Sequence, residues 1–258
     1  MKHILLAAAA AFTLATSALG TSAQAAETVV IPKEPWSFDG VFGKFDRLQL
    51  QRGLQVYKEV CASCHGLKYV AFRDLRALGY SDEQIKAFAL EYEFPDIDDE
   101  GSDTTRKGLP SDRFPDPYPN EKFARASNNG ALPPDLSLMS KAREGGPDYL
   151  FHLITGYEDP PAGFELLEGL HYNKYFADGN FQIAMAKQIM DDQVTYADGT
   201  KATTDQIARD ITAFLHWAAE PKLENRHSAG FRVMLYTIIF TILAFFLKKR
   251  IWARLEKK

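Results

Sequence analysis

Two cysteines and a histidine stand together in the segment Cys61-Ala62-Ser63-Cys64-His65. In a C-x-x-C-H segment each thiol can add to one vinyl group of the same haem, and the adjacent histidine reaches the iron as an axial ligand. A thioredoxin-like site would need a βαβ context, and a zinc site would need further cysteines or a second pair of ligands. The segment therefore predicts one covalently bound haem c, attached to Cys61 and Cys64, with His65 as an iron ligand.

The composition narrows the class of protein further. The chain has 258 residues, 46% of them hydrophobic and 25% charged, which is enough apolar surface for a folded core. Two cysteines are too few for a disulfide scaffold, a four-cysteine zinc site or a cysteine-ligated iron–sulfur cluster. The formal net charge of −4 argues against a nucleic-acid-binding protein, whose binding surface is basic.

The second axial ligand of the iron is left open by the residue pattern. Residues 1–25 and 229–250 are set aside because they are predicted below to be a signal peptide and a membrane anchor. The remaining candidates are three methionines and four histidines: Met139, Met185, Met190, His152, His171, His216 and His227. A methionine ligand raises the redox potential and favours electron transfer, whereas an open position permits oxygen or peroxide chemistry. Because a lone methionine usually fills a core, the pattern does not separate Met185 from Met190.

Two predicted helices can position the haem segment. Leu50, Gly53, Leu54 and Tyr57 recur at helical spacing and form one face of a helix that leads into the cysteines. A second helix is expected over residues 203–219, with Thr203 and Gln206 as a capping box and Pro221 just beyond its end. Gly53 would let the two helices approach closely. We therefore expect a mainly α, cytochrome c-like haem domain with long irregular loops.

The N-terminal segment has the features of a secretory signal peptide. A basic residue at Lys2 precedes an apolar, alanine-rich stretch, and Ala23-Gln24-Ala25 is a small-x-small cleavage site. Residues 1–25 are therefore predicted to be removed on export. Residues 26–228 are expected to form the extracytoplasmic haem domain.

The C-terminal segment is predicted to anchor the protein in a membrane. The apolar run 233–247 is lengthened by Gly230, Phe231 and a snorkelling Arg232 to nearly the length of a membrane span, giving an anchor over residues 229–250. Basic residues begin at Lys248 and continue through residues 251–258, which form a basic tail. The positive-inside rule places this tail in the cytoplasm. Together with the signal peptide, this predicts a single-pass protein of the bacterial inner membrane with its haem domain in the periplasm.

The charge is divided unevenly between these parts. Residues 26–230 contain 33 acidic and 22 basic side chains, so the exported domain carries about −11. Seven acidic residues and no basic residue lie between Glu91 and Asp103, followed by a proline-rich stretch, which predicts a long surface loop or a partly disordered segment. Such a loop can serve solubility alone, or it can steer a basic soluble cytochrome to the domain.

Five separated segments of the chain are distinctive: RGLQVYKEVCASCHGLKYVAFRDL (52–75), ARASNNGALPPDLSLM (124–139), ITGYEDPPAGF (154–164), IAM (183–185) and FLHWAAEP (214–221). They resemble the cytochrome c1 family, the c-type haem subunits of cytochrome bc1 complexes. The resemblance runs in the family's order from about Trp36 to Arg250.

The resemblance implies a role for individual residues. Cys61 and Cys64 match the residues that hold the haem, and His65 and Met185 match the axial ligands, which favours Met185 over Met190. Arg125 matches an arginine beside a haem propionate, where a guanidinium offsets a carboxylate by paired hydrogen bonds. The loop 128–134 resembles the wall of the haem pocket, and one of its carbonyls is expected to orient the ring of His65.

The sequence departs from the family in two places. Ala186, Lys187, Gln188 and Ile189 follow Met185 where many members have prolines, so the loop lacks that source of stiffness. A second pair of cysteines, found in some bacterial members, is also absent.

The resemblance implies an electron-transfer subunit of ubiquinol–cytochrome c reductase, with no substrate-converting site of its own. Its partners would be cytochrome b, the Rieske iron–sulfur subunit that donates electrons, and a soluble basic c-type cytochrome that accepts them. Two alternatives are a free-standing, membrane-anchored cytochrome that feeds a terminal oxidase and a haem peroxidase with an open sixth position.

Overall fold

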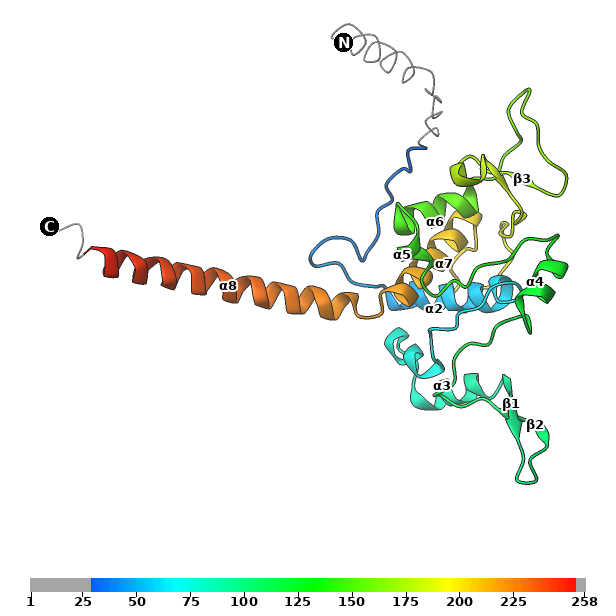
Figure 1. Cartoon of the computed structure of the whole chain (residues 1–258), viewed down its shortest axis with the longest axis horizontal. Helices are drawn as coiled ribbons and strands as arrows, with labels where there is room; N and C mark the ends of the chain where they lie inside the picture. Colours follow the sequence, from blue (N-terminus) through cyan, green and yellow to red (C-terminus); the bar gives the residue numbers. More distant parts are fainter. Residues whose placement is uncertain (1–28, 254–258) are drawn as a thin grey trace, which may run out of the picture. The chain divides into compact units, whose positions relative to one another are not determined.

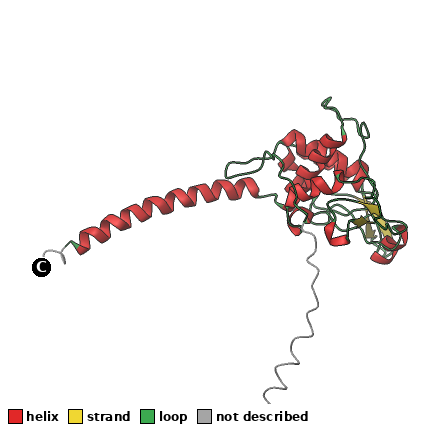
Figure 2. Ribbon diagram, turned by 90° about the horizontal axis from the view of Figure 1, so that it is seen from above, coloured by secondary structure: helices red, strands yellow, loops and turns green. Residues whose placement is uncertain are grey.

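The computed structural model describes residues 29–253, which form a mainly helical domain followed by one long helix (Figure 1). The predicted signal peptide and the last five residues of the basic tail lie outside the described residues. Helices and loops dominate, as predicted, and a few short strands are also present (Figure 2). The helices are α2 (Arg47–Val56), α3 (Asp82–Ala89), α4 (Glu121–Ser127), α5 (Met139–Ala142), α6 (Gly146–Thr155), α7 (Thr204–Ala219) and α8 (Leu223–Trp252).

Shorter elements complete the chain. They are a π-helical segment (Tyr57–Cys61), two 3-10 helices (Phe72–Leu78 and Ala177–Gly179) and the strands β1 (Glu93–Ile97), β2 (Asp103–Lys107), β3 (His171–Tyr172) and β4 (Gln182–Ile183). The strands make two antiparallel pairs, β1 with β2 and β3 with β4. We call residues 31–222, which precede α8, the helical domain.

Helix α2 has the buried face that its sequence predicts. The Asp46 side chain accepts hydrogen bonds from the amides of Leu48 and Gln49 and so caps the first turn. The residues of the predicted apolar face, Leu50, Gly53, Leu54 and Tyr57, are all buried. The chain continues from α2 into the π-helical segment without a break, so α2 sets the position of Cys61.

Helix α7 begins at its predicted cap. The Thr203 hydroxyl accepts a hydrogen bond from the Gln206 amide at 3.2 Å, and α7 ends at Ala219, two residues before Pro221. The reciprocal half of the expected capping box is not formed, because the Gln206 side chain donates to Asp210 instead. Helices α2, α5 and α6 pack against α7, which makes it the centre of the domain.

The crossing of α2 and α7 depends on Gly53. A Cβ atom at Gly53 would overlap the backbone carbonyl of Asp210 and would lie 2.5 Å from the Cβ atom of Phe214, so no other residue fits without moving a helix. One residue away, the Arg52 guanidinium binds both carboxylate oxygens of the fully buried Asp210, at 2.9 and 3.1 Å. The expected close approach of the two helices is confirmed.

The acidic segment is more ordered than the sequence prediction, which was wrong on this point. Most of residues 91–103 belong to a β-hairpin, in which Glu93 pairs with Lys107 and Phe94 pairs with Arg106. Proline at Pro95 is compatible with a strand here because both strands of a two-stranded hairpin are edges. The hairpin rests on a cluster of aromatic rings in which Phe72 contacts Tyr92, Phe94 and Phe114 at centroid distances of 4.9 to 6.2 Å.

Helix α8 contains the predicted anchor and begins several residues before it. Within the described residues it is the one helix long and apolar enough to cross a membrane. Its large apolar side chains from Phe231 onward are exposed, as expected of a helix that faces lipid. Its first turn is bound to the helical domain through Glu224, which accepts hydrogen bonds from the Phe45 amide and the Arg47 guanidinium.

Substitution of Gly53 tests the helix crossing. We expect Gly53→Ala to lower the free energy of unfolding by about 2 kcal/mol, because overlap with α7 exceeds the gain of under about 1 kcal/mol in helix propensity. Denaturant unfolding of the haem-loaded protein in detergent measures it. Gly230→Ala is the matched control, since nothing lies within 4 Å of a Cβ atom at Gly230. Equal stability of the two variants would contradict the role of Gly53.

Candidate haem site

The C-x-x-C-H segment is wound into a tight turn at the end of α2. The amide of Ala62 donates to the carbonyl of Tyr57 at 2.8 Å, which is the wider spacing of a π-helix. The amides of Cys64 and His65 then both donate to the carbonyl of Cys61, at 3.1 and 2.9 Å. These bonds hold both cysteines and the histidine within one compact turn.

The two thiols are free and partly buried. Burial, assisted by the nearby Cys64, raises the pKa of the Cys61 thiol to about 12, so the group is neutral at physiological pH. Two unlinked thiols in one turn are the donor set that a haem with two vinyl groups requires.

The ring of His65 is fixed in the orientation of a metal ligand. Its Nδ1 atom lies 2.7 Å from the carbonyl oxygen of Pro134. Because a carbonyl can only accept, Nδ1 carries the proton and Nε2 keeps its lone pair. Burial lowers the pKa of His65, which favours the neutral, ligating imidazole. The expected contact between the 128–134 loop and the His65 ring is therefore present, and the accepting carbonyl is that of Pro134.

Tyr57 fixes the backbone of the same residue. Its hydroxyl donates to the His65 carbonyl at 3.0 Å, while its ring contacts Phe114 and Phe214. Burial raises the pKa of Tyr57 far above its ordinary value, so the hydroxyl remains a donor. The sequence analysis counted Tyr57 as a residue of the buried helix face and missed this bond. It links residues eight positions apart, which approach each other through the π-helical segment and the turn after it.

The loop that holds the His65 ring is itself held at its other end by Arg125. This exposed residue of α4 donates from Nη1 to the Gly130 carbonyl at 3.1 Å. Asn128 donates to the Ala124 carbonyl and to the Tyr118 hydroxyl, at 2.7 and 3.0 Å. The structure thus brings Arg125 and the loop wall into one unit with His65, and the remaining N–H groups of the guanidinium can still bind an anion.

The three candidate methionines lie in different environments. Met185 follows β4 and is half-buried, and its carbonyl accepts a hydrogen bond from the Tyr157 hydroxyl at 2.8 Å. Met190 is 57% exposed, and Met139 packs against the core. An iron ligand must be shielded from water, so the environment of Met185 suits this role better than that of Met190.

Two of the rival histidines are engaged by protein groups. His216 Nδ1 lies 2.7 Å from the Ser140 hydroxyl, and its ring stacks on Phe38. His152 Nε2 lies 3.2 Å from a carboxylate oxygen of Glu34. Of the other two candidate histidines, His171 is exposed to solvent. His227 lies at the start of α8, beside the Gly43 carbonyl.

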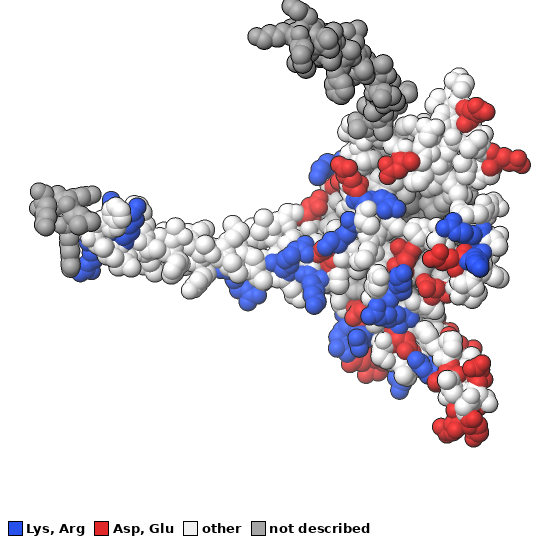
Figure 3. Space-filling model, in the orientation of Figure 1, with Lys and Arg blue, Asp and Glu red and all other residues white. Residues whose placement is uncertain are grey.

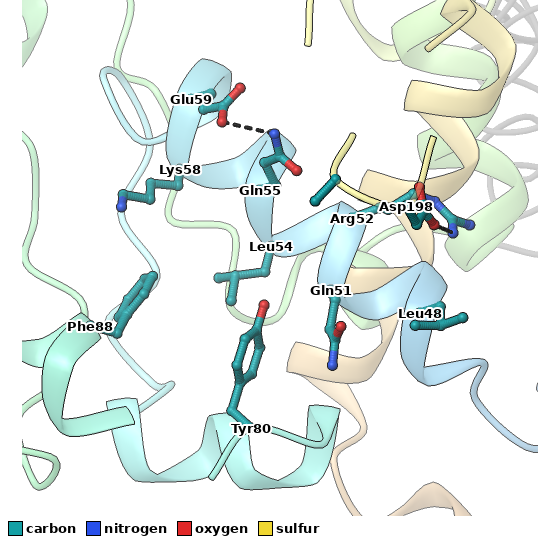
Figure 4. A pocket seen from close by; sticks show the side chains of 11 residues that line it. Leu48, Gln51, Arg52, Leu54, Gln55, Lys58, Glu59, Tyr80, Phe88 and Asp198 are labelled. Atoms are coloured by element: carbon teal, nitrogen blue, oxygen red, sulfur yellow. Dashed lines mark hydrogen bonds and ion pairs between the residues drawn. The ribbon is translucent and has the colours of Figure 1, made fainter. Parts of the chain in front are cut away.

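A hollow of about 310 Å³ lies beside α2 and includes none of the predicted haem residues (Figure 4). Its walls come from α2, the π-helical segment, Tyr80, Phe88 and the turn at Asp198. Within it, Arg52 pairs with Asp198 and Gln55 bonds Glu59, so its polar groups are largely matched to one another.

The negative surface of the hairpin is partly neutralised by neighbouring residues. The acidic side chains away from the hairpin turn form ion pairs: Glu91 with Lys58, Glu93 with Lys107 and Asp96 with Arg106. The carboxylates that form no ion pair within the described residues gather around the turn, where Figure 3 shows an acidic group. They are Asp98, Asp99, Glu100 and Asp103.

The fold and the site together define a class of protein: a helical domain that presents two thiols and an oriented histidine to a haem, followed by a helix suited to a membrane. Comparison with known proteins makes this specific. A family model described as Cytochrome C1 family matches residues 36–255. The chain belongs to the cytochrome c1 family, and this membership implies a haem cofactor and a part in electron transport.

Curated relatives agree over most of the chain. It is 47% identical over 253 residues to cytochrome c1 of Rhodospirillum rubrum. This match covers 91% of this chain and 92% of the relative. It is 44% identical to the mitochondrial cytochrome c1 1 heme protein of Arabidopsis thaliana, over 98% of this chain and 82% of the relative. It is also 49% identical to cytochrome b/c1 of Bradyrhizobium diazoefficiens, over 86% of this chain and 35% of that longer relative.

The half-buried His216 predicts a pH dependence of stability. Burial lowers its folded-state pKa to about 4, against about 6.5 in the unfolded chain. The folded state therefore excludes a proton that the unfolded state binds, and stability is lost as pH falls below about 6.5. Between about pH 7 and about pH 4.5 we expect a loss of about 2 kcal/mol from this group.

Denaturant unfolding at both pH values checks the expectation. His216→Phe, which retains a ring against Phe38, should reduce the pH dependence by about that amount. His171→Phe removes an exposed histidine and should leave the dependence as in the original protein. Equal pH dependence of both variants would contradict the assignment to His216.

Proposed function

We propose that the chain is the membrane-anchored c-type haem subunit of a ubiquinol–cytochrome c reductase. It takes electrons from a Rieske iron–sulfur protein and passes them to a soluble c-type cytochrome. The observation that carries the proposal is the His65 ring, neutral and oriented by Pro134, within one turn of two free thiols. Family membership and the relative named cytochrome b/c1 support assembly with a cytochrome b.

The proposed roles of the site residues combine the family resemblance with the chemistry of their side chains. Cys61 and Cys64 would hold a haem covalently, and His65 through Nε2 and Met185 would bind its iron. Arg125 offsets the charge of a propionate with the N–H groups that the Gly130 carbonyl leaves free. Bound haem supplies an iron that alternates between the ferrous and ferric states, and the chain's residues fix its ligands and exclude water.

The placement in the cell rests on the two ends of the chain. Residues 1–25 act as a signal peptide, residues 26–228 form the periplasmic haem domain, residues 229–250 anchor it and residues 251–258 stay in the cytoplasm. The long apolar helix α8 supports the anchor. A free-standing anchored cytochrome would share all these features, and co-purification of a cytochrome b and a Rieske protein distinguishes the two proposals.

The Met185 assignment can be tested by spectrum and potential. We expect Met185→Leu to lower the haem redox potential strongly and to let carbon monoxide bind the ferrous iron, because a methionine ligand raises the potential and closes the sixth position. Visible spectroscopy with a redox titration measures both effects. Met190→Leu is the control and should change neither. If Met190→Leu gave these changes and Met185→Leu did not, Met190 would be the ligand.

The hairpin turn is expected to steer a basic cytochrome. The variant D98N/D99N/E100Q/D103N removes the unpaired charges of the turn. We expect a basic cytochrome to oxidise the reduced haem of this variant about tenfold more slowly at low salt, with a weaker dependence on ionic strength. The Asp98 side chain accepts hydrogen bonds from the amides of Glu100 and Ser102. An asparagine side chain keeps an accepting oxygen, so the D98N change preserves the turn.

Stopped-flow kinetics with a basic c-type cytochrome at several ionic strengths measures this effect. The control neutralises four acids outside the hairpin: Asp159, Glu165, Glu168 and Asp178. An unchanged salt slope in the hairpin variant would remove this cluster from the docking surface.

A further inference from the structure

A sharp turn before α2 holds two apolar side chains in an exposed position. Val41 is 58% exposed and Phe42 is 76% exposed. The Gly43 amide closes the turn on the Gly40 carbonyl at 3.2 Å, and Gly40 has a φ of +75°, which other residues rarely adopt. A side chain on Gly43 would overlap the backbone of Phe38. The exposure is therefore imposed by the backbone of a specific turn.

The same turn is fastened to the beginning of α8. His227 Nδ1 lies 3.3 Å from the Gly43 carbonyl, and Glu224 accepts the Phe45 amide at 3.0 Å. The ring of Phe42 lies 5.7 Å from the ring of Phe231, which begins the apolar part of the helix. The exposed apolar surface of α8 thus continues without interruption onto the turn.

The chemistry of this surface matches the boundary of a lipid bilayer. Phenylalanine side chains of interfacial segments bury at the boundary between headgroups and acyl chains, and lysine and arginine beside them bind lipid phosphates. Lys44 ends the turn, Lys222 precedes α8 and Arg232 lies in its third turn, in a region where Figure 3 shows basic side chains gathered. Arg226, between them, is paired with Glu220. A protein-facing apolar patch would not require such a basic flank.

We propose that the turn 39–44 is a second contact of this protein with the membrane, in which Val41 and Phe42 enter the headgroup boundary beside Phe231. The occupant of this apolar surface is lipid. A single helix leaves the helical domain free to tilt, whereas a second contact limits the tilt. The inference rests on the proposed function only in requiring that α8 spans a membrane.

Nitroxide labels on the full-length, haem-loaded protein in phosphatidylcholine vesicles test the proposal. Labels are placed by F42C, by L167C as an equally solvent-facing apolar control, and by F240C within α8. Leu167 is 58% exposed and lies in a loop of the helical domain. Collision rates with oxygen, which concentrates in lipid, and with a water-soluble nickel chelate report the surroundings of each label. V41C provides a second position if F42C folds poorly.

The expected result is an oxygen-to-nickel collision ratio several-fold higher at positions 42 and 240 than at position 167. If position 240 lies in lipid and position 42 matches 167, the inference is overturned and the anchor stands. If position 42 is shielded from both reagents, a protein surface covers the turn, which also overturns the inference. If position 240 itself lies in water, the anchor of the proposed function fails as well.

Discussion

The contact between α2 and α7 is the constraint on which the haem site depends. Gly53 permits the two backbones to touch, and the ion pair of Arg52 with the fully buried Asp210 fixes how far along each other the helices lie. Removing one partner of a buried ion pair typically costs about 3 to 5 kcal/mol, because the other charge stays buried without compensation. The helix that carries Cys61 at its end is thereby fixed against the central helix of the domain.

From this fixed end the chain positions the histidine in two steps. The π-helical segment places Tyr57 so that it can bind the His65 backbone, and the Pro134 carbonyl then fixes the ring. Pro134 belongs to a loop that Arg125 holds through Gly130, so α4 supports the site although none of its residues needs to reach the iron. Each hydrogen bond contributes only about 1 kcal/mol, but together they leave the ring one orientation.

Features that depend on neighbouring residues were predictable from the sequence. Features that depend on contacts between residues far apart in the sequence were not. The spacing of Leu50, Gly53 and Leu54 predicts α2, and the Thr203 cap predicts the start of α7, because both patterns act within a few residues. The hairpin depends on pairing of Phe94 with Arg106 across a turn, and the acidic composition conceals it. The expected loop contact with His65 could be predicted, but its identification with Pro134 required the folded chain.

The loop after Met185 shows how side chains can replace the stiffness of proline. Prolines restrict the unfolded chain by about 0.4 to 1 kcal/mol each, and this sequence lacks them here. Three hydrogen bonds act in their place: Tyr157 binds the Met185 carbonyl, Gln193 accepts the Met190 amide, and Asp191 accepts the Thr204 amide. Buried Ile189 and Val194 hold the segment between these bonds against the core. Each hydrogen bond stabilises the folded loop by about 1 kcal/mol, which is similar to the contribution of one proline. The hydrogen bonds act on the folded loop, whereas prolines act on the unfolded chain. The departure from the family pattern therefore changes how the loop is ordered and leaves the position of Met185 fixed by Tyr157.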